Sequence, residues 1–124
     1  MHKVTISELQ EKPMDGAAPV PGWTGGPVSR TRQTIIGEGE SANYSSSVVN
    51  FSKGATTGWH THPCDQILIV TAGRGIAATE KEECEIAVGD VVVLKANERH
   101  WHGAKADTTM SHITITTAGG RPTR

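Results

Sequence analysis

The chain has 124 residues, of which 20% are charged and 35% hydrophobic, and its formal net charge is −1 when the histidines are neutral. This length is enough for one domain with one core. So small a net charge argues against binding to nucleic acid or to an anionic membrane. No apolar run approaches the roughly 20 residues of a membrane span, and the first residues lack the apolar centre of a secretory signal. We therefore expect a cytoplasmic protein.

Residues 1–22 are rich in proline, glycine, alanine and charge, and their one short apolar patch is Ile6–Leu9. We expect a flexible N-terminal arm with one short turn or edge strand, lying over the rest of the chain or over a partner. The two cysteines, Cys64 and Cys84, have no Cys-x-x-Cys spacing, which argues against a structural disulfide.

From residue 28 onward the pattern is that of short strands separated by polar or glycine-containing turns, with no 3.6-residue apolar repeat that would indicate a helix. The expected strands are Val28–Ile36, Tyr44–Ser52, Asp65–Thr71, Gly75–Thr79, Cys84–Ala87, Val91–Leu94, Arg99–His102 and Thr109–Thr117. Strands at this spacing predict a sandwich or a closed barrel. We assign residues 23–117 to this barrel and residues 118–124 to a loose C-terminal tail.

The stretch Gly54–Gly73, GATTGWHTHPCDQILIVTAG, carries the first candidate ligands. In an extended strand alternate side chains share a face, so His60, His62 and Gln66 point the same way, followed on that face by apolar residues. Imidazole and amide groups that lead into a core are typical of a metal site at the mouth of a barrel.

A second stretch, GDVVVLKANERHWHGA from Gly89, contains an apolar strand, a polar turn, and then His100 and His102 on a shared face. The residues alone leave three roles open for His102: a fifth metal ligand, a proton carrier or a packed core histidine.

In Thr109–Thr117 the even-numbered residues, His112 among them, share one face, and Ile113 and Ile115 share the other. If the polar face points into the barrel, His112 is a candidate general base, because an unperturbed imidazole titrates at about 6.5. If the isoleucines point inward instead, His112 is exposed.

The pairing of His-x-His-x3-Gln-x6-Gly with Gly-x5-Lys-x-Asn-x2-His resembles the two motifs of the cupin superfamily. This resemblance implies an all-β fold, a single double-stranded β-helix or jelly-roll-like barrel. The metal ligands that it implies are His60, His62, Gln66 and His100. Gln66 replaces the usual glutamate of the family. The usual Pro-x-Gly of the second motif is Lys95–Asn97, where asparagine can also take the left-handed turn conformation.

Within the superfamily, TGWHTHPCDQILIVTAGRG and HWHGAKADTTMSHITI are similar to small single-domain bacterial cupins that include the manganese-dependent hydroxynitrile lyases. That subgroup also has glutamine at the position of Gln66. The similarity implies that the divalent metal is manganese, with Fe, Ni or Zn as other candidates. It also implies that Thr57 and His112 line the substrate pocket. A glutamine of the lyase pocket falls at Thr116, which is shorter and has no amide.

The function that this similarity implies is cleavage of a small cyanohydrin to an aldehyde and cyanide, with the metal as Lewis acid and His112 as base. Thr57 would stabilise the cyanide, and His102 is the third candidate catalytic residue. Two other functions stay open: an Fe-dependent dioxygenase, and a non-catalytic cupin that binds a metal or a small ligand.

A homodimer is the expected assembly, since cupins commonly dimerise through sheet faces or swapped N-terminal strands. Trp59 and Trp101 lie next to proposed ligands but have the opposite parity. We therefore expect both rings to face away from the metal, against another layer or a partner chain.

Overall fold

The computed structural model describes residues 1–20 and 29–124. Its elements are the 3₁₀ turn η1 (Ile6–Glu8) and the strands β1 (Lys12–Pro13), β2 (Arg30–Ile36), β3 (Tyr44–Phe51), β4 (Gln66–Thr79), β5 (Glu83–Ala87), β6 (Val91–Leu94), β7 (His100–Ala104) and β8 (Met110–Thr117). The predicted all-β fold is confirmed. In this part of the chain no helix is long and apolar enough to cross a membrane.

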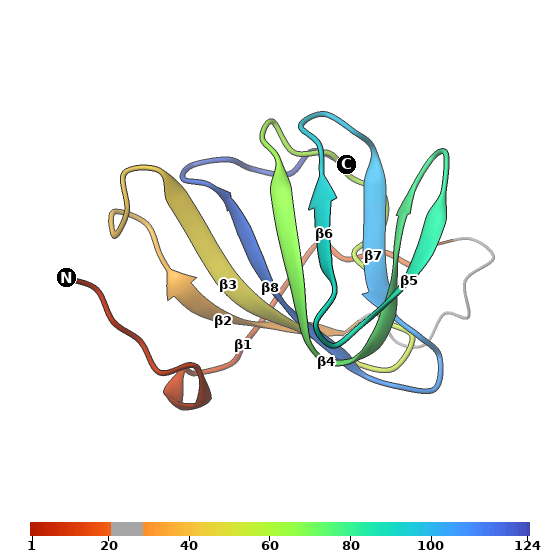
Figure 1. Ribbon diagram of the computed structural model, residues 1–124, viewed down its shortest axis with the longest axis horizontal. Coiled ribbons are helices and arrows are strands. Elements are labelled where there is room, and N and C mark those ends of the chain that lie inside the picture. The colour runs from red at the N-terminus through yellow and green to blue at the C-terminus, as the bar shows by residue number, and fades with distance from the viewer. Residues whose placement is uncertain (21–28) are drawn as a thin grey trace.

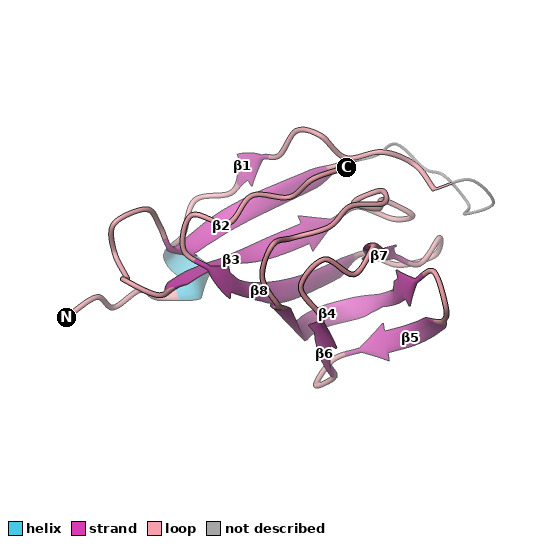
Figure 2. Ribbon diagram, turned by 90° about the horizontal axis from the view of Figure 1, so that it is seen from above, coloured by secondary structure: helices cyan, strands magenta, loops and turns pink. Residues whose placement is uncertain are grey.

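Every strand pairing among the described residues is antiparallel. Hydrogen-bonded neighbours follow the order β1-β2-β3-β8-β4-β5, and β6 and β7 also pair with β4. One sheet contains β1, β2, β3, β8, β6 and the first half of β4, and the other contains β5, β7 and the second half of β4; Figure 2 shows β2 and β3 side by side and apart from β5. Figure 1 shows β4 bending at its middle. Its first half pairs with β6 and β8, and its second half pairs with β5 and β7. This strand therefore joins the two layers.

The continuity of β4 corrects the sequence prediction of two strands, Asp65–Thr71 and Gly75–Thr79, with a turn between them. The structure has one strand of 14 residues that contains a bulge. Gly73, in the predicted turn, has a φ of 69°. A Cβ atom there would lie 1.8 Å from the carbonyl oxygen of Thr109. Glycine thus lets the strand bend while it stays paired, instead of ending it.

The other predicted strands agree with the structure to within two residues at each end, where they can be compared. Val28 and the neighbouring residues 21–27, which contain the predicted start of the barrel, lie outside the described residues.

The N-terminal arm contains η1 and the short strand β1, which pairs with β2. In the predicted tail, Thr123 exchanges backbone hydrogen bonds of 2.7 and 2.8 Å with Thr61. The domain boundaries themselves remain a prediction.

Among the described residues the apolar core has two parts. One lies between the layers and contains Val49, Phe51, Ala55, Val70, Ala77, Ile86, Ala104 and Met110. The other contains Val20, Ile76, Ala78 and Trp101, with the half-buried Trp59 against it. Trp101 is 2% exposed, so this outward-facing ring is covered by Val20 of the same chain. The guanidinium carbon of Arg99 lies 4.7 Å from the centre of the Trp59 ring. The predicted dimer remains an expectation.

Candidate functional site

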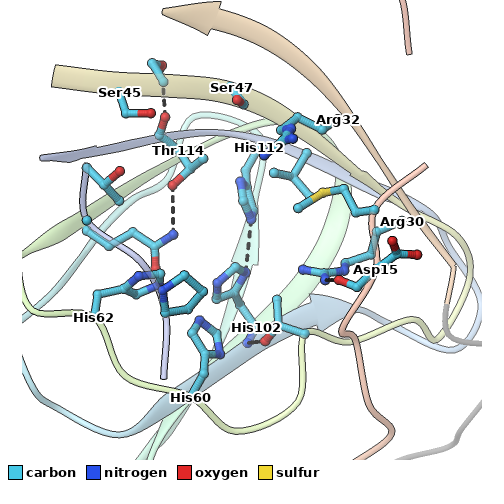
Figure 3. A pocket seen from close by; sticks show the side chains of 18 of the residues that line it. Asp15, Arg30, Arg32, Ser45, Ser47, His60, His62, His102, His112 and Thr114 are labelled. Carbon is cyan, nitrogen blue, oxygen red and sulfur yellow. Dashed lines mark hydrogen bonds between the residues drawn. The ribbon is translucent and has the colours of Figure 1, made fainter. Parts of the chain in front are cut away.

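A cavity of about 250 Å³ lies inside the barrel. Polar side chains from the N-terminal arm, the loop before β4, several strands and the C-terminal residues surround it. The lining residues are Met14, Asp15, Arg30, Arg32, Ser45, Ser46, Ser47, Val49, Thr57, His60, His62, Gln66, His102, His112, Thr114, Thr116, Gly120, Pro122 and Arg124. Figure 3 shows this cavity from close by. The structure therefore places all the predicted site residues except His100 along one cavity.

His100 belongs to the site through its contacts with the other histidines. One ring nitrogen each from His60, His62 and His100 lie within 4.8 Å of one another, as a metal site requires. His60 and His100 are joined by two backbone hydrogen bonds of 2.9 and 3.0 Å. The extended strand expected at His60–Gln66 is a loop with isolated bridges, and β4 begins only at Gln66. Pairing with His100, rather than strand periodicity, thus positions His60.

Backbone carbonyl groups fix two of the three imidazole rings. Nδ1 of His60 donates a hydrogen bond to the Gly58 oxygen at 2.8 Å, and Nδ1 of His100 donates to the Glu98 oxygen at 2.7 Å. A carbonyl oxygen only accepts, so each Nδ1 carries the proton and each neutral ring keeps a free lone pair on Nε2. Nε2 of His62 is buried without a hydrogen-bond partner among the described residues. All three rings therefore have a nitrogen available to a metal.

Burial keeps these histidines neutral. Loss of solvation lowers the pKa of His60 to about 3. The same cause lowers the pKa of His62 and of His100. Because the neutral imidazole is the form that binds metals, the three rings are in the metal-binding state at neutral pH.

The amide of Gln66 completes the cluster. Its Nε2 donates a hydrogen bond of 2.8 Å to Oγ1 of Thr114, which leaves Oε1 at 3.2 Å from Nε2 of His100. In this arrangement two acceptors face each other, because Nδ1 of His100 already carries the ring proton. A cation between the two atoms would remove this conflict. Three imidazole nitrogens and one amide oxygen thus fit a divalent transition metal.

His102 and His112 form a second, hydrogen-bonded pair, with 3.0 Å between Nδ1 of His102 and Nε2 of His112. The ring centre of His102 also lies 5.6 Å from that of His60 and 6.0 Å from that of His100. The ring contacts of His112 among the described residues are with His102 and Phe51 only. His102 therefore lies between His112 and the metal cluster.

Both members of this pair are neutral at neutral pH. They are 3% and 0% exposed, and burial lowers the pKa of His112 to about 4 and that of His102 well below its usual value. The positive charge of Arg30 lowers both further. Nε2 of His102 and Nδ1 of His112 have no hydrogen-bond partner among the described residues. The two facing nitrogens therefore share one proton, and one of the two outer nitrogens has a free lone pair.

The orientation of β8 agrees with the inward reading of its polar face. His112 is fully buried, and Thr114 and Thr116 line the cavity. Ile113 and Ile115 lie on the other face and are half-buried. The alternative, with the isoleucines inside and His112 exposed, is wrong.

Thr57 lines the cavity and is 3% exposed, but its hydroxyl group already has two partners. It donates to the Gly58 oxygen at 2.9 Å and accepts from the backbone N–H of His102 at 3.2 Å. This hydroxyl group therefore ties the loop that carries His60 to the strand that carries His102.

The cavity residues that were not predicted from the sequence include three arginines, Arg30, Arg32 and Arg124. They belong to no motif. The available signal was the spacing of Arg30 and Arg32, which places two cationic side chains on one face of the predicted strand Val28–Ile36.

The comparisons with known proteins agree on one family. Residues 47–116 match the family described as cupin domain. A cupin-like protein from Thermotoga maritima is 31% identical, with a TM-score of 0.70, over 87% of this chain and 85% of that protein. The polyketide cyclase from Streptomyces resistomycificus superposes with a TM-score of 0.78 over 100% of this chain and 84% of that one. At 14% identity, it shows a shared fold alone.

The (R)-mandelonitrile lyase of Granulicella tundricola is 53% identical over 68 residues. The match covers 54% of this chain and 52% of the lyase, so the chain spans about half the length of this relative.

Proposed function

Since this chain belongs to the cupin family, we propose that it is a metal-dependent lyase that cleaves a cyanohydrin to an aldehyde and cyanide. The observation that carries this proposal is the His102–His112 pair, a neutral base in the cavity that two of the three clustered imidazoles, His60 and His62, also line. The similarity to an (R)-mandelonitrile lyase supports the choice of reaction.

His60, His62, His100 and Gln66 are the residues that would hold the metal, for which we propose manganese. When bound, the ion supplies a Lewis acid that lowers the pKa of a substrate hydroxyl group. The four ligands are neutral, so they leave the charge of a divalent ion uncompensated.

His102 is the group that we propose takes the hydroxyl proton of the cyanohydrin. If its Nδ1 donates to Nε2 of His112, its own Nε2 has a free lone pair and is the base. His112 then accepts the hydrogen bond of the imidazolium that forms, and so stabilises it. His112 thus acts through His102, and Thr57 positions the backbone of His102 instead of donating to cyanide.

As the hydroxyl proton moves to His102, the O–H electron pair forms the carbonyl bond of the aldehyde. The carbon–carbon bond to the nitrile breaks, and its electron pair leaves with cyanide. The imidazolium of His102 then returns its proton to cyanide, which releases hydrogen cyanide and restores the neutral pair.

The test is cyanide release from (R)-mandelonitrile by manganese-loaded protein. His102→Ala should lower the rate by about a hundredfold or more, as expected for loss of a general base. His112→Ala should lower it less, because it removes only the partner of the base. His2→Ala, which changes a residue paired with Glu40 away from the cavity, is the control.

Two results would contradict the proposal: release no faster than from metal-free protein, or His102→Ala as fast as the parent. Oxygen uptake that requires ferrous iron and a carbon substrate would support the dioxygenase alternative in its place.

A further inference from the structure

One side of the cavity is formed by three arginines from distant parts of the chain. Arg30 and Arg32 come from β2, and Arg124 comes from the C-terminal residues. We call these three residues the arginine wall. In Figure 3, Arg30 and Arg32 lie to the right of His102 and His112, on the side away from His62. Arg30 and Arg32 are therefore on the opposite side of the shared cavity from His62.

Arg30 is the most buried member of the wall, at 8% exposure. Burial, together with the charges of Arg124 and Arg32, lowers its pKa to about 10, so it stays protonated at neutral pH. Its Nη2 donates to the backbone oxygen of Asp15 at 2.9 Å. Its Nε is buried without an acceptor among the described residues. A buried cation with an unused donor is unfavourable unless something else pairs with it.

No member of the wall forms an ion pair within the described part of the chain. The ion pairs there join His2 to Glu40, Arg74 to Asp107, Arg99 to Glu80 and Lys105 to Glu85. The one acidic residue that lines the cavity is Asp15, whose contact with Arg30 is through the backbone. The wall therefore has an excess of positive charge facing the cavity.

Arg124 is held in place by the loop that precedes the metal cluster. Its Nη1 donates a hydrogen bond to the backbone oxygen of Thr57. The same nitrogen lies so close to Gly58 that a Cβ atom there would be 3.2 Å away. Its charge also contributes to the lowered pKa of His60, after the larger effect of burial. The third cation of the wall is thus fixed close to the histidines.

We propose that the arginine wall binds a carboxylate, and that the cavity takes, besides the cyanohydrin of the proposed function, a small hydroxy or oxo acid as a ligand. A guanidinium group matches a carboxylate in charge and in the spacing of its donors. The nitrile group of a neutral cyanohydrin offers Arg30 no negative charge. A cavity of about 250 Å³ can hold one small molecule whose carboxylate meets the wall and whose oxygen-bearing end meets the histidines. This inference rests on the arginines and does not require the lyase reaction.

Calorimetric titration with mandelate and with mandelamide tests the proposal on metal-loaded protein. The two probes share the ring and the hydroxyl group and differ in charge. Mandelate should bind about tenfold or more tightly than mandelamide, as expected for a charge-assisted pair. Arg30→Gln should remove most of that difference by weakening mandelate alone. Arg74→Gln, at an exposed arginine paired with Asp107, should leave both affinities unchanged.

Arg32→Gln provides a second test at an exposed position. It should weaken mandelate binding about threefold, since an exposed pair contributes less than a buried one. Equal affinity for the two probes, or parental affinity for mandelate in both correctly folded variants, would overturn the carboxylate subsite. Turnover is not measured, so failure of the lyase proposal leaves this result intact. If the protein releases cyanide but binds mandelate no more tightly than mandelamide, the carboxylate subsite is refuted and the lyase proposal is not.

Discussion

The histidine cluster and the arginine wall occupy the same cavity but are stabilised in opposite ways. His60 and His100 donate to backbone carbonyl groups, and burial keeps both neutral. Arg30 is buried while charged, and its Nε has no acceptor among the described residues. The protein thus supplies the orientation of the metal ligands by itself, whereas the wall lacks a counter-ion that a bound molecule can provide. Metal binding and anion binding should therefore respond to different substitutions.

The largest expected effect is on metal binding by His100→Ala. Loss of this ligand should lower manganese affinity by more than about a hundredfold, because even changes to groups that only orient a ligand cost 10–100-fold. Arg32→Gln is the matched change at the other side of the cavity and should keep the parental metal content. The measurement is the metal-to-protein ratio after dialysis against manganese. Equal ratios in the two variants would contradict the separation of the two regions.

The next effect is on stability in acid. His112 has a folded-state pKa of about 4 against an ordinary value of 6.5. Between these values the unfolded chain binds more protons, so stability present above pH 6.5 is lost as the pH falls toward 4. His112→Asn should reduce the loss between about pH 7.5 and pH 5 by about 2 kcal/mol.

Urea unfolding of the metal-free protein at the two pH values measures this difference. Arg30, with a pKa of about 10, stays charged at both and contributes no such dependence. An identical loss of stability in parent and variant would show that His112 does not titrate in this range.

The smallest expected effect is that of Thr114→Val on the orientation of Gln66. Without the hydroxyl acceptor, the amide is free to rotate its oxygen away from His100. Manganese affinity should fall about tenfold. Thr116→Val is the control, two residues further along the same face of β8, and should leave manganese affinity within about twofold of the parent. Titration of manganese into both metal-free variants makes the comparison, and equal affinities would remove the positioning role of Thr114.

The resemblance to the two cupin motifs was enough to identify the residues of the histidine cluster. The His-x-His and Gln positions of the first motif and the His of the second are close together in the structure. The left-handed conformation expected for Asn97 is also present, with a φ of 65°. The conformation of Asn97 depends on local backbone preference, which the sequence expresses directly.

Features that depend on distant partners were not predictable in the same way. Gly73 favours a turn by its own preference, but its close approach to Thr109 keeps it within a strand. The position of His102 between His112 and the metal cluster depends on how β7 and β8 face each other. Arg124 enters the cavity only because Thr123 pairs with Thr61. No local pattern specifies such a return of the chain.

The burial of Trp101 has a practical consequence. Its indole ring is 2% exposed, and in β7 it is flanked by His100 and His102. Indole emission is sensitive to its surroundings, so Trp101 supplies an intrinsic optical reporter for events in the barrel. Replacing the half-buried Trp59 with phenylalanine would reduce background light, and filling of the site could then be followed in real time without a dye.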